Sequence, residues 1–315
     1  MTTFGAFINL PEYDAETGRR KSILESVLLG HQPEYKHGQA QYSQYLTMAN
    51  ALASAGSMPD IFLATCWPGL EALKNNTGKG IVFTGLTEQP GATYDTRITG
   101  IKAFSVTTLC QNWLALLRQI TSSITRVAVI YDQDQTHESM QAQFAEIDRV
   151  KAPLSSIQTI HAEDPTGQQP LNPNIESEIA DFAQDDNPAG LIVTAGTRTL
   201  LLRENIVRAV NAANRATPKL FAIYPASICV DSGGLMSYGP DLSKLYRAAA
   251  HCLGLMIELN IPPEDFQKRI PIIENKNFEL VVSKSAASHL NINIPSMFTV
   301  TIDGTSQQIK PTVVT

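Results

Sequence analysis

The fold of this chain is indicated best by one stretch, Asp231-Ser232-Gly233-Gly234-Leu235-Met236-Ser237-Tyr238-Gly239-Pro240-Asp241-Leu242. It combines three glycines, a short apolar strand and the start of a helix. Glycine lets a backbone approach another group closely or adopt positive φ angles. Asp241 precedes a long helical pattern, so we expect it at the N-cap or in the first turn. Because open α/β folds present backbone groups to a ligand where a strand runs into a helix, the stretch predicts binding and not catalysis.

Apolar runs alternate with helical patterns along most of the chain, which is typical of a parallel α/β sheet. A first series has strands at 4–10, 35–37, 60–64, 81–84 and 98–104, with helices at 21–29, 42–55 and 68–74. A second series has strands at 126–131, 155–161, 190–194, 219–224 and 278–283, with helices at 108–120, 139–150, 175–184, 199–214 and 242–260. Ile261-Pro262-Pro263 should end the last helix and mark a crossover. The predicted fold class is α/β, with two doubly wound Rossmann-like lobes and a ligand cleft between them.

The composition excludes several classes of protein. Hydrophobic residues make up 43% of the 315 residues and charged residues 17%, as in globular proteins. The formal charge of −6 argues against binding to nucleic acid. No apolar run approaches the roughly 18 residues that cross a bilayer, so we expect no direct membrane insertion. The N-terminus lacks the pattern of an export signal. We therefore expect a periplasmic or extracytoplasmic protein if such a signal was removed, and a cytoplasmic protein otherwise.

The sequence predicts neither a metal site, nor a cofactor, nor an enzyme. The six histidines form no H-E-x-x-H pattern. There is no G-x-S-x-G, no phosphate-binding Gly-Lys-Ser/Thr and no G-x-G-x-x-G after the first strand. The four cysteines are scattered, and we expect buried or half-buried thiols. A Cys66–Cys229 or Cys110–Cys252 disulfide is the alternative that the sequence leaves open.

Polar and aromatic side chains follow six of the predicted strands, where doubly wound sheets bind their ligands. Thr65 and Thr197 begin helices whose free amides suit a carboxylate, although Thr65 can equally serve as a simple cap. Trp67 is either a stacking platform or buried packing. Glu88 and Asp132 suit an ammonium group or lie in ordinary polar loops. The candidates at strand ends are Glu12, Tyr13, Thr65, Cys66, Trp67, Gly85, Thr87, Glu88, Tyr131, Asp132, Gly196, Thr197 and Tyr224.

Several motifs resemble those of the ABC transporter substrate-binding protein family of unassigned specificity, which includes binding proteins for tryptophan and related aromatic amino acids. The specific similarity lies in the C-terminal third, and the first fifty residues match weakly. The motifs are Ser232–Leu242 with Leu245-Tyr246-Arg247, Asn277–Lys284 followed by Ile294-Pro295, and the middle strands Arg126–Tyr131 and Ile98–Ile101.

The resemblance implies a type I periplasmic-binding fold, whose two lobes are joined by three crossovers and close on a small ligand. The lobes would comprise 1–103 plus 222–260 and 104–221 plus 261–315, with the glycine-rich stretch just after the second crossover. The resemblance also adds Ser237, Tyr238 and Gly239 to the candidate ligand-binding residues, and it implies a membrane permease as partner. Asp132 stands where the family usually has Asn, and Trp67 where a small residue is common.

The expected function is that of a solute-binding protein of an ABC-type importer. It would capture an amino acid or aromatic compound, with Trp67, Tyr131 and Tyr224 covering an apolar body. One alternative is a cytoplasmic ligand sensor of the same fold that acts through a partner protein. The other is an α/β enzyme, because fold does not fix function.

Overall fold

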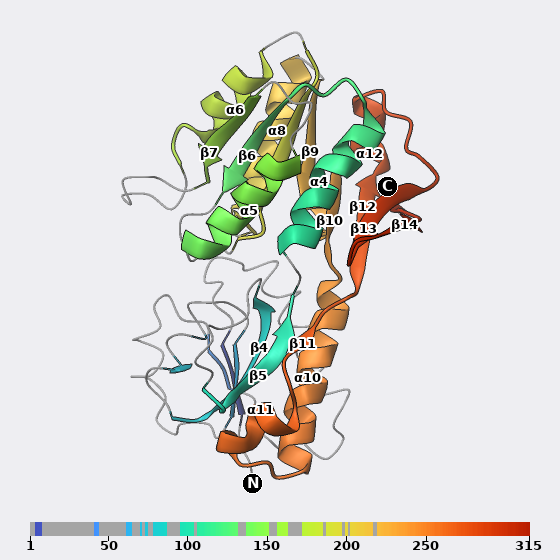
Figure 1. Cartoon of the computed structure of the whole chain (residues 1–315). Coiled ribbons are helices and arrows are strands. Elements are labelled where there is room, and N and C mark those ends of the chain that lie inside the picture. Colours follow the sequence, from blue (N-terminus) through green and yellow to red (C-terminus); the bar gives the residue numbers. More distant parts are fainter. Residues whose placement is uncertain are drawn as a thin grey trace. The chain divides into compact units, whose positions relative to one another are not determined.

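The structure is a computed structural model of the whole chain (Figure 1). It describes residues 4–7, 41–43, 61–64, 70, 73–74, 78–86, 95–103, 106–131, 137–150, 156–162, 172–184, 187–196, 199–200, 202–216 and 219–315. Among these residues, no helix has both the length and the apolar character needed to span a membrane.

The chain forms two compact units, and it passes from one to the other three times. The first unit comprises Met1–Ser105 and Leu242–Asn277, and the second comprises Val106–Asp241 and Phe278–Thr315. These bounds differ from the expected ones, because residues 222–241 belong to the second unit and residues 261–277 to the first. The glycine-rich stretch therefore lies before the second crossover, and the third crossover lies after Asn277 instead of at Pro262-Pro263.

The first unit is built on a six-stranded sheet with the strand order β11-β5-β4-β3-β1-β2, and all of its recorded pairings are parallel. The strands are β1 (Phe4–Phe7), β2 (Gln41–Ser43), β3 (Ile61–Ala64), β4 (Gly80–Leu86), β5 (Ile98–Lys102) and β11 (Ile273–Glu274). α10 (Leu242–Glu258) packs on β4 and β5, and α11 (Phe266–Arg269) packs on β5 after the 3-10 helix η2 (Pro263–Asp265). Residues 42 and 43 lie in a strand where we expected a helix to begin, because β2 pairs with β1.

The second unit is built on a seven-stranded sheet with the order β15-β12-β10-β9-β8-β6-β7. β10 and β12 are antiparallel, and the other neighbours are parallel. The strands are β6 (Arg126–Tyr131), β7 (Ser156–His161), β8 (Ala189–Val193), β9 (Leu220–Tyr224), β10 (Met236–Pro240), β12 (Phe278–Ser283) and β15 (Thr312–Val314). The placement of β9 and β10 in this sheet explains why residues 222–241 join the second unit.

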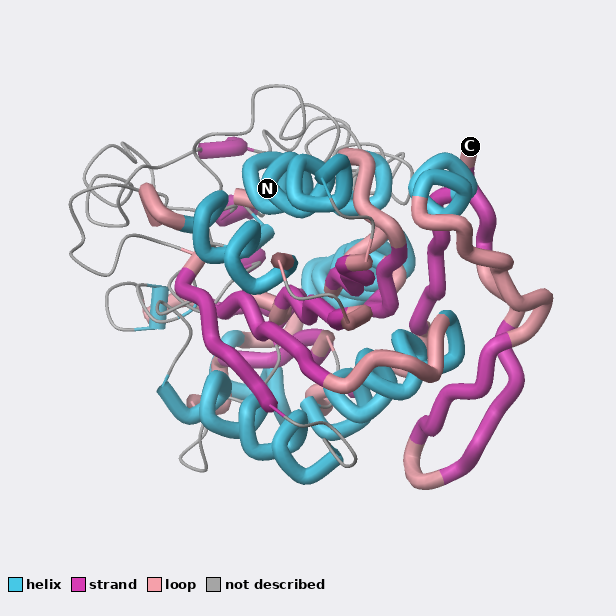
Figure 2. The backbone as a smooth tube through the Cα atoms, turned by 90° about the horizontal axis from the view of Figure 1, so that it is seen from above, coloured by secondary structure: helices cyan, strands magenta, loops and turns pink. Residues whose placement is uncertain are grey.

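Helices cover both faces of this sheet, as a doubly wound fold requires (Figure 2). On one face, α4 (Val106–Ile120) contacts β8, β9 and β10 and packs against α5 (His137–Val150). On the other, α6 (Ile175–Ala183), α8 (Arg203–Ala216) and the short α9 (Ile228–Asp231) cover a cluster of buried residues. Gly190 faces Leu117 of α4, whereas the next residue, Leu191, belongs to the cluster under α6 and α8. This alternation places successive strand residues on opposite faces.

A β-hairpin near the C-terminus is fastened to α4 by side-chain amides. Its strands are β13 (Phe298–Ile302) and β14 (Thr305–Ile309), and α12 (Lys284–His289) precedes it. Asn112 donates to the Thr301 carbonyl (2.8 Å) and accepts from the Thr301 amide (2.7 Å). Gln119 does the same for Thr299, at 2.8 and 2.7 Å. The side-chain amides of Asn112 and Gln119 thus form hydrogen bonds with the backbone groups along one edge of β13, as a third strand would. The sequence did not predict this hairpin.

The glycines of the opening stretch allow close approach of the chain to itself. A Cβ atom at Gly239 would lie 1.7 Å from the Pro225 carbonyl oxygen, and one at Gly234 would lie 2.6 Å from the Tyr224 ring. Gly233 has φ of +100°, which side chains rarely adopt. The glycines therefore serve the packing of β10 and α9 against β9, and their presence does not require a ligand.

Asn275 joins the first and third crossing segments inside the first unit. Its backbone amide donates to the Lys102 carbonyl (2.9 Å), and its side-chain amide donates to the carbonyls of Ala103 and Asn277, both at 3.0 Å. Its side-chain oxygen accepts from the Asn277 amide (3.0 Å). A buried residue thus holds both segments at the point where they leave the unit.

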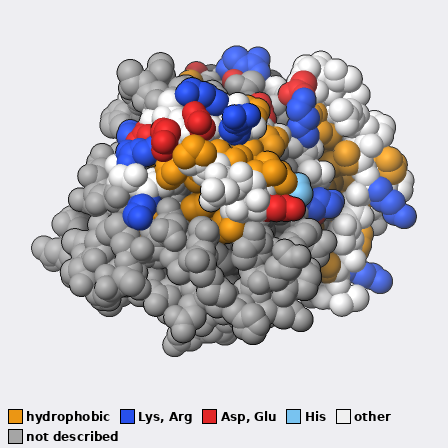
Figure 3. All heavy atoms as spheres, turned by 90° about the horizontal axis from the view of Figure 1, so that it is seen from below, with side chains coloured by type: hydrophobic (Ala, Val, Ile, Leu, Met, Phe, Trp, Pro, Cys, Tyr) orange, Lys and Arg blue, Asp and Glu red, His pale blue; other side chains and the backbone are white. Residues whose placement is uncertain are grey.

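The surface of the described residues carries charges of both signs. On the face shown in Figure 3, acidic and basic side chains are interspersed around apolar ones. On this face, the described side chains of the two signs are therefore mixed and form no single basic patch.

Candidate functional site

The carboxyl ends of the parallel strands in the second unit meet at one edge of the sheet, which we call the carboxyl edge. Tyr131 and His161 end β6 and β7, and they are register partners. Thr194 follows β8 directly, and its amide donates to the Ile130 carbonyl (2.9 Å), which places it beside Tyr131. Because ligands of doubly wound sheets bind at this edge, these residues form the candidate site of the second unit.

The Tyr131 ring contacts two other rings. Its hydroxyl is hydrogen-bonded to Nε2 of His161, and the two ring centroids are 4.3 Å apart at a tilted angle. Phe144 of α5 approaches Tyr131 edge-on, with centroids 5.1 Å apart. Both Tyr131 and His161 are half-buried, so the pair reaches the surface of the edge. The sequence predicted Tyr131 as a site residue and did not identify His161.

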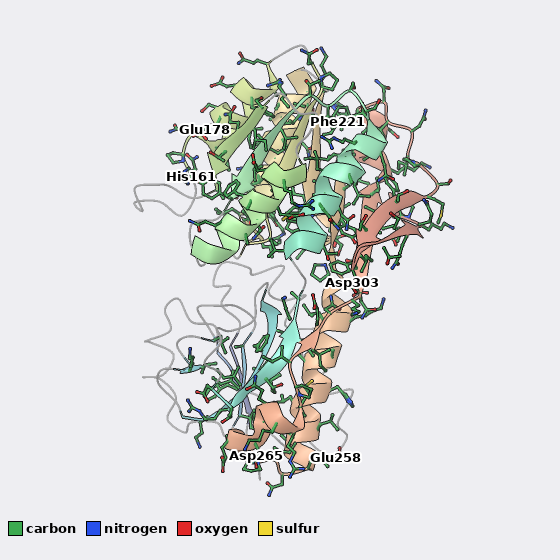
Figure 4. The ribbon with its side chains drawn as sticks, viewed as in Figure 1. His161, Glu178, Phe221, Glu258, Asp265 and Asp303 are labelled. Atoms are coloured by element: carbon green, nitrogen blue, oxygen red, sulfur yellow. The ribbon has the colours of Figure 1, made fainter. Side chains whose placement is uncertain are left out.

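The backbone of His161 is anchored by Asn172, which is itself buried. The Asn172 side-chain amide donates to the His161 carbonyl (3.0 Å) and to Oε1 of Glu178 on α6 (3.2 Å). Burial lowers the pKa of the His161 imidazole below its ordinary value, and the Glu178 carboxylate opposes this shift. Figure 4 shows His161 and Glu178 on the same side of the second unit. The imidazole is therefore biased toward its neutral form near pH 7.

The loop after β8 is closed by a buried hydroxyl. Thr199 accepts from the Gly196 amide (3.0 Å), and its hydroxyl lies 2.8 Å from the Thr194 carbonyl, to which it donates. The Gly196 amide also lies 3.1 Å from the Thr194 carbonyl. This amide, which we expected to meet a ligand, is thus used within the loop. The Thr194 hydroxyl oxygen, by contrast, is buried and has no hydrogen-bond partner in the described structure.

Four predicted site residues lie in the interior of the second unit. Tyr224 is fully buried with its hydroxyl unpartnered, and burial raises the pKa of that hydroxyl well above its ordinary value. Ser237 is also buried with an unpartnered hydroxyl. Tyr238 stacks on Phe278, with centroids 5.6 Å apart, and its carbonyl accepts from the Trp113 indole (2.8 Å). Together with the tightly packed Gly239, none of these residues is exposed in this structure.

The first unit has a carboxyl edge of its own, and Gly85 lies there. Gly85 is exposed and has φ of +78°, and the pairing of β4 with β5 shifts register between Thr84 and Leu86. Gly85 therefore forms a β-bulge, which explains the glycine without a ligand. Next to it, the Thr84 hydroxyl is buried and unpartnered.

The remaining candidates lie outside the described residues. These are Glu12, Tyr13, Thr65, Cys66, Trp67, Thr87, Glu88, Asp132 and Thr197.

Within the part of the chain that the structure describes, no cluster of three or more His, Cys, Asp or Glu side chains could hold a metal ion. Cys110, Cys229 and Cys252 are buried free thiols, so the alternative Cys110–Cys252 disulfide is not formed. Burial raises the pKa of Cys110 well above its ordinary value, which keeps this thiol protonated and unreactive.

Comparison with known proteins identifies the fold. No family model matches the chain. No curated protein matches it either. A conserved domain protein from Vibrio cholerae superposes with a TM-score of 0.72 at 20% identity, over 94% of this chain and 96% of that one. The ABC domain from Streptococcus pneumoniae in complex with L-Trp superposes with a TM-score of 0.68 at 15% identity, over 94% of this chain and 96% of that one. A probable maltose operon transcriptional repressor from Staphylococcus aureus superposes with a TM-score of 0.64 at 14% identity, over 90% of this chain and 97% of that one.

Sugar-binding and cyclitol-binding proteins share this fold as well. An ABC transporter solute-binding protein from Bacillus halodurans with bound myo-inositol matches at 9% identity and a TM-score of 0.59, over 92% of this chain and 97% of that one. An ABC transporter periplasmic solute-binding protein from Actinobacillus succinogenes with bound D-allose matches at 10% identity and a TM-score of 0.62, over 91% of this chain and 99% of that one. The chain therefore has the α/β fold of type I periplasmic binding proteins.

Proposed function

We propose that this protein is a solute-binding protein that captures a small organic molecule and delivers it to the membrane permease of an ABC-type importer. The observation that carries this proposal is the match of its fold, over nearly the whole chain, to proteins solved with small ligands bound. The carboxyl edge supports it, since Tyr131, His161 and Thr194 offer aromatic surface and hydrogen-bonding groups where this class of sheet binds ligands. We propose no enzymatic activity.

The ligand proposed is an amino acid or an aromatic compound. Helix amides at Thr65 and Thr197 would receive a carboxylate, and Glu88 or Asp132 would meet an amine. Trp67, together with Tyr131, would cover the apolar body. The neighbours with myo-inositol and D-allose extend the set of compounds worth testing to sugars and cyclitols. An importer's binding protein acts outside the cytoplasm, so we propose an extracytoplasmic location.

Capture requires a ligand that prefers the closed arrangement of the two lobes. A preference of roughly 5.5 kcal/mol changes an open-to-closed ratio from 99:1 to 1:99. A ligand present at about 100 times its dissociation constant would stabilise the folded protein by about 2.7 kcal/mol, which raises the melting temperature by several degrees.

A thermal-shift screen tests the proposal directly. The compounds are the common amino acids, aromatic carboxylic acids, myo-inositol and D-allose, and calorimetry confirms each hit. We expect at least one of them to raise the melting temperature in a saturable way. If none does and calorimetry detects no binding heat, the proposed function is contradicted.

A second candidate is a ligand sensor of the same fold that acts through a partner protein. The structural neighbour described as a probable transcriptional repressor favours it. Fractionation of native cells distinguishes the two, because a sensor would be recovered with the cytoplasm and an importer component outside it. Ligand-dependent co-purification with the permease supports the importer.

A further inference from the structure

Tyr131 and His161 form a hydrogen-bonded pair at the end of adjacent parallel strands. Their register pairing, the hydrogen bond between the phenol and Nε2 and the tilted ring contact at 4.3 Å fix the imidazole beside the hydroxyl. The Phe144 ring also contacts the Tyr131 ring edge-on, with centroids 5.1 Å apart. Because these contacts hold the ring, the hydroxyl proton can change direction while the ring stays in place.

That direction depends on the charge of the imidazole. A neutral imidazole with a free lone pair on Nε2 accepts the phenol proton, so the Tyr131 oxygen presents only lone pairs to a ligand. A protonated imidazole donates from Nε2 to the phenol oxygen, which releases the phenol proton toward a ligand. The two states of His161 thus present opposite hydrogen-bonding groups at the same point of the edge.

We propose that His161 is a positioning residue that makes Tyr131 select ligand groups that donate hydrogen bonds near neutral pH and groups that accept them in acid. This inference rests on the proposed function, because it assumes that a ligand meets Tyr131. Ammonium, amide and hydroxyl groups would be favoured above the titration of His161, and carboxylate or carbonyl groups below it.

The surroundings of His161 place this titration below neutrality. Burial disfavours the imidazolium, and the Glu178 carboxylate of α6 opposes this effect. The Glu178 carboxylate also accepts from Asn172, whose amide anchors the His161 backbone. β6 contributes the Tyr131 phenol, and α5 contributes the apolar Phe144 ring. The selection for donating groups therefore applies at pH 7.

The bond is tested without any ligand by following the imidazole signals of the full chain by NMR across pH 4 to 9. His161→Gln identifies the His161 signal, and His289→Gln, at an exposed position of α12, is the matched control. We expect Tyr131→Phe to raise the His161 pKa by roughly half a pH unit or more, because the neutral imidazole loses its donor. An unchanged or lowered pKa would overturn the proposed direction of this hydrogen bond.

The selection is tested by calorimetry at pH 8.0 and 5.5 with tryptamine, which offers an ammonium group, and indole-3-propionate, which offers a carboxylate. We expect tryptamine to bind roughly 5- to 10-fold more weakly at pH 5.5, and indole-3-propionate more tightly by a similar factor. His161→Gln should abolish both changes, and His289→Gln should keep them.

Affinities that do not change with pH, or that change equally in His161→Gln, overturn the selection. If neither probe binds at either pH while Tyr131→Phe still raises the His161 pKa, the aromatic ligand class is refuted. The selection then fails with it, and the coupling of the two side chains alone is supported.

Discussion

Replacement of Asn112 by Ala should loosen the C-terminal hairpin from α4 without disturbing the helix. Asn112 is buried, and its amide makes both hydrogen bonds to the Thr301 backbone, at 2.7 and 2.8 Å. It also donates to the Thr108 carbonyl (2.7 Å) and lies 3.5 Å from the Tyr238 hydroxyl. Alanine is the best helix former, so α4 itself should persist. The change removes both bonds to Thr301: the half-buried Thr301 amide loses the Asn112 oxygen, and the carbonyl keeps only the longer bond from Gln111. We expect a cost of about 2–3 kcal/mol.

Native-state hydrogen exchange measures this loss at the atom concerned. The Thr301 amide should exchange roughly 30-fold to 100-fold faster in Asn112→Ala, because each 1.4 kcal/mol corresponds to a factor of ten. Gln111→Ala removes a single, longer bond to the same carbonyl (3.2 Å) and serves as the matched control, with an expected cost below about 1 kcal/mol. The Thr299 amide, held by Gln119, reports whether the whole strand loosens. An increase of less than threefold at Thr301, or an equal effect of the control, would refute the role assigned to Asn112.

Four further substitutions test the packing and the site. Gly239→Ala should destabilise the second unit by about 3 kcal/mol or more, since a Cβ would lie 1.7 Å from the Pro225 oxygen; urea unfolding with stability near wild type would contradict this. Thr194→Val should leave the melting temperature unchanged or slightly higher, because the Thr194 hydroxyl is buried without a hydrogen-bond partner. Thr199→Val should lower the melting temperature, because the loss of the Thr199 hydrogen bonds costs about 1–3 kcal/mol. A larger decrease in Thr194→Val than in Thr199→Val would contradict the roles assigned to these two hydroxyls. Burial holds the pKa of His161 below its ordinary value, so its contribution to stability is present above that ordinary value and is lost as the pH falls through the folded value. The melting temperatures at pH 8 and pH 5 should therefore differ less in His161→Gln than in the wild type. The same difference in both proteins would contradict the contribution of His161 to the pH dependence of stability.

The sequence predicted most elements of the second series, from residue 108 onward, because their physical signals are strong. β6 was expected at 126–131 and lies there, since its four central residues form a buried apolar run. α10 was expected at 242–260 and ends two residues earlier, before the turn that leads to Pro262. By contrast, β14 is short, polar and largely exposed, so its sequence carries neither an apolar run nor alternation.

The candidate site was predicted less completely, because neighbours in a sheet are set by strand order. Tyr131 was identified as a polar strand end, but its pairing with His161 depends on β7 lying next to β6, which alternation of elements does not reveal. The glycines at 234 and 239 were correctly associated with close approach, yet the approaching groups belong to Tyr224 and Pro225. The crossovers were misplaced for a similar reason, since only the pairing of β11 with β5 assigns residues 273–274 to the first unit.

The hydrogen bonds between Asn112 and the hairpin have a consequence for synthesis of the chain on the ribosome. Asn112 and Thr301 are 189 residues apart in sequence. At about 5–20 residues per second, translation separates the two by roughly 10–40 s. During this interval α4 has been made but the strand that satisfies its amides has not, so the nascent second unit must wait in an incomplete form. Chaperones that bind nascent chains would therefore meet the second unit before β13 covers its contact surface on α4.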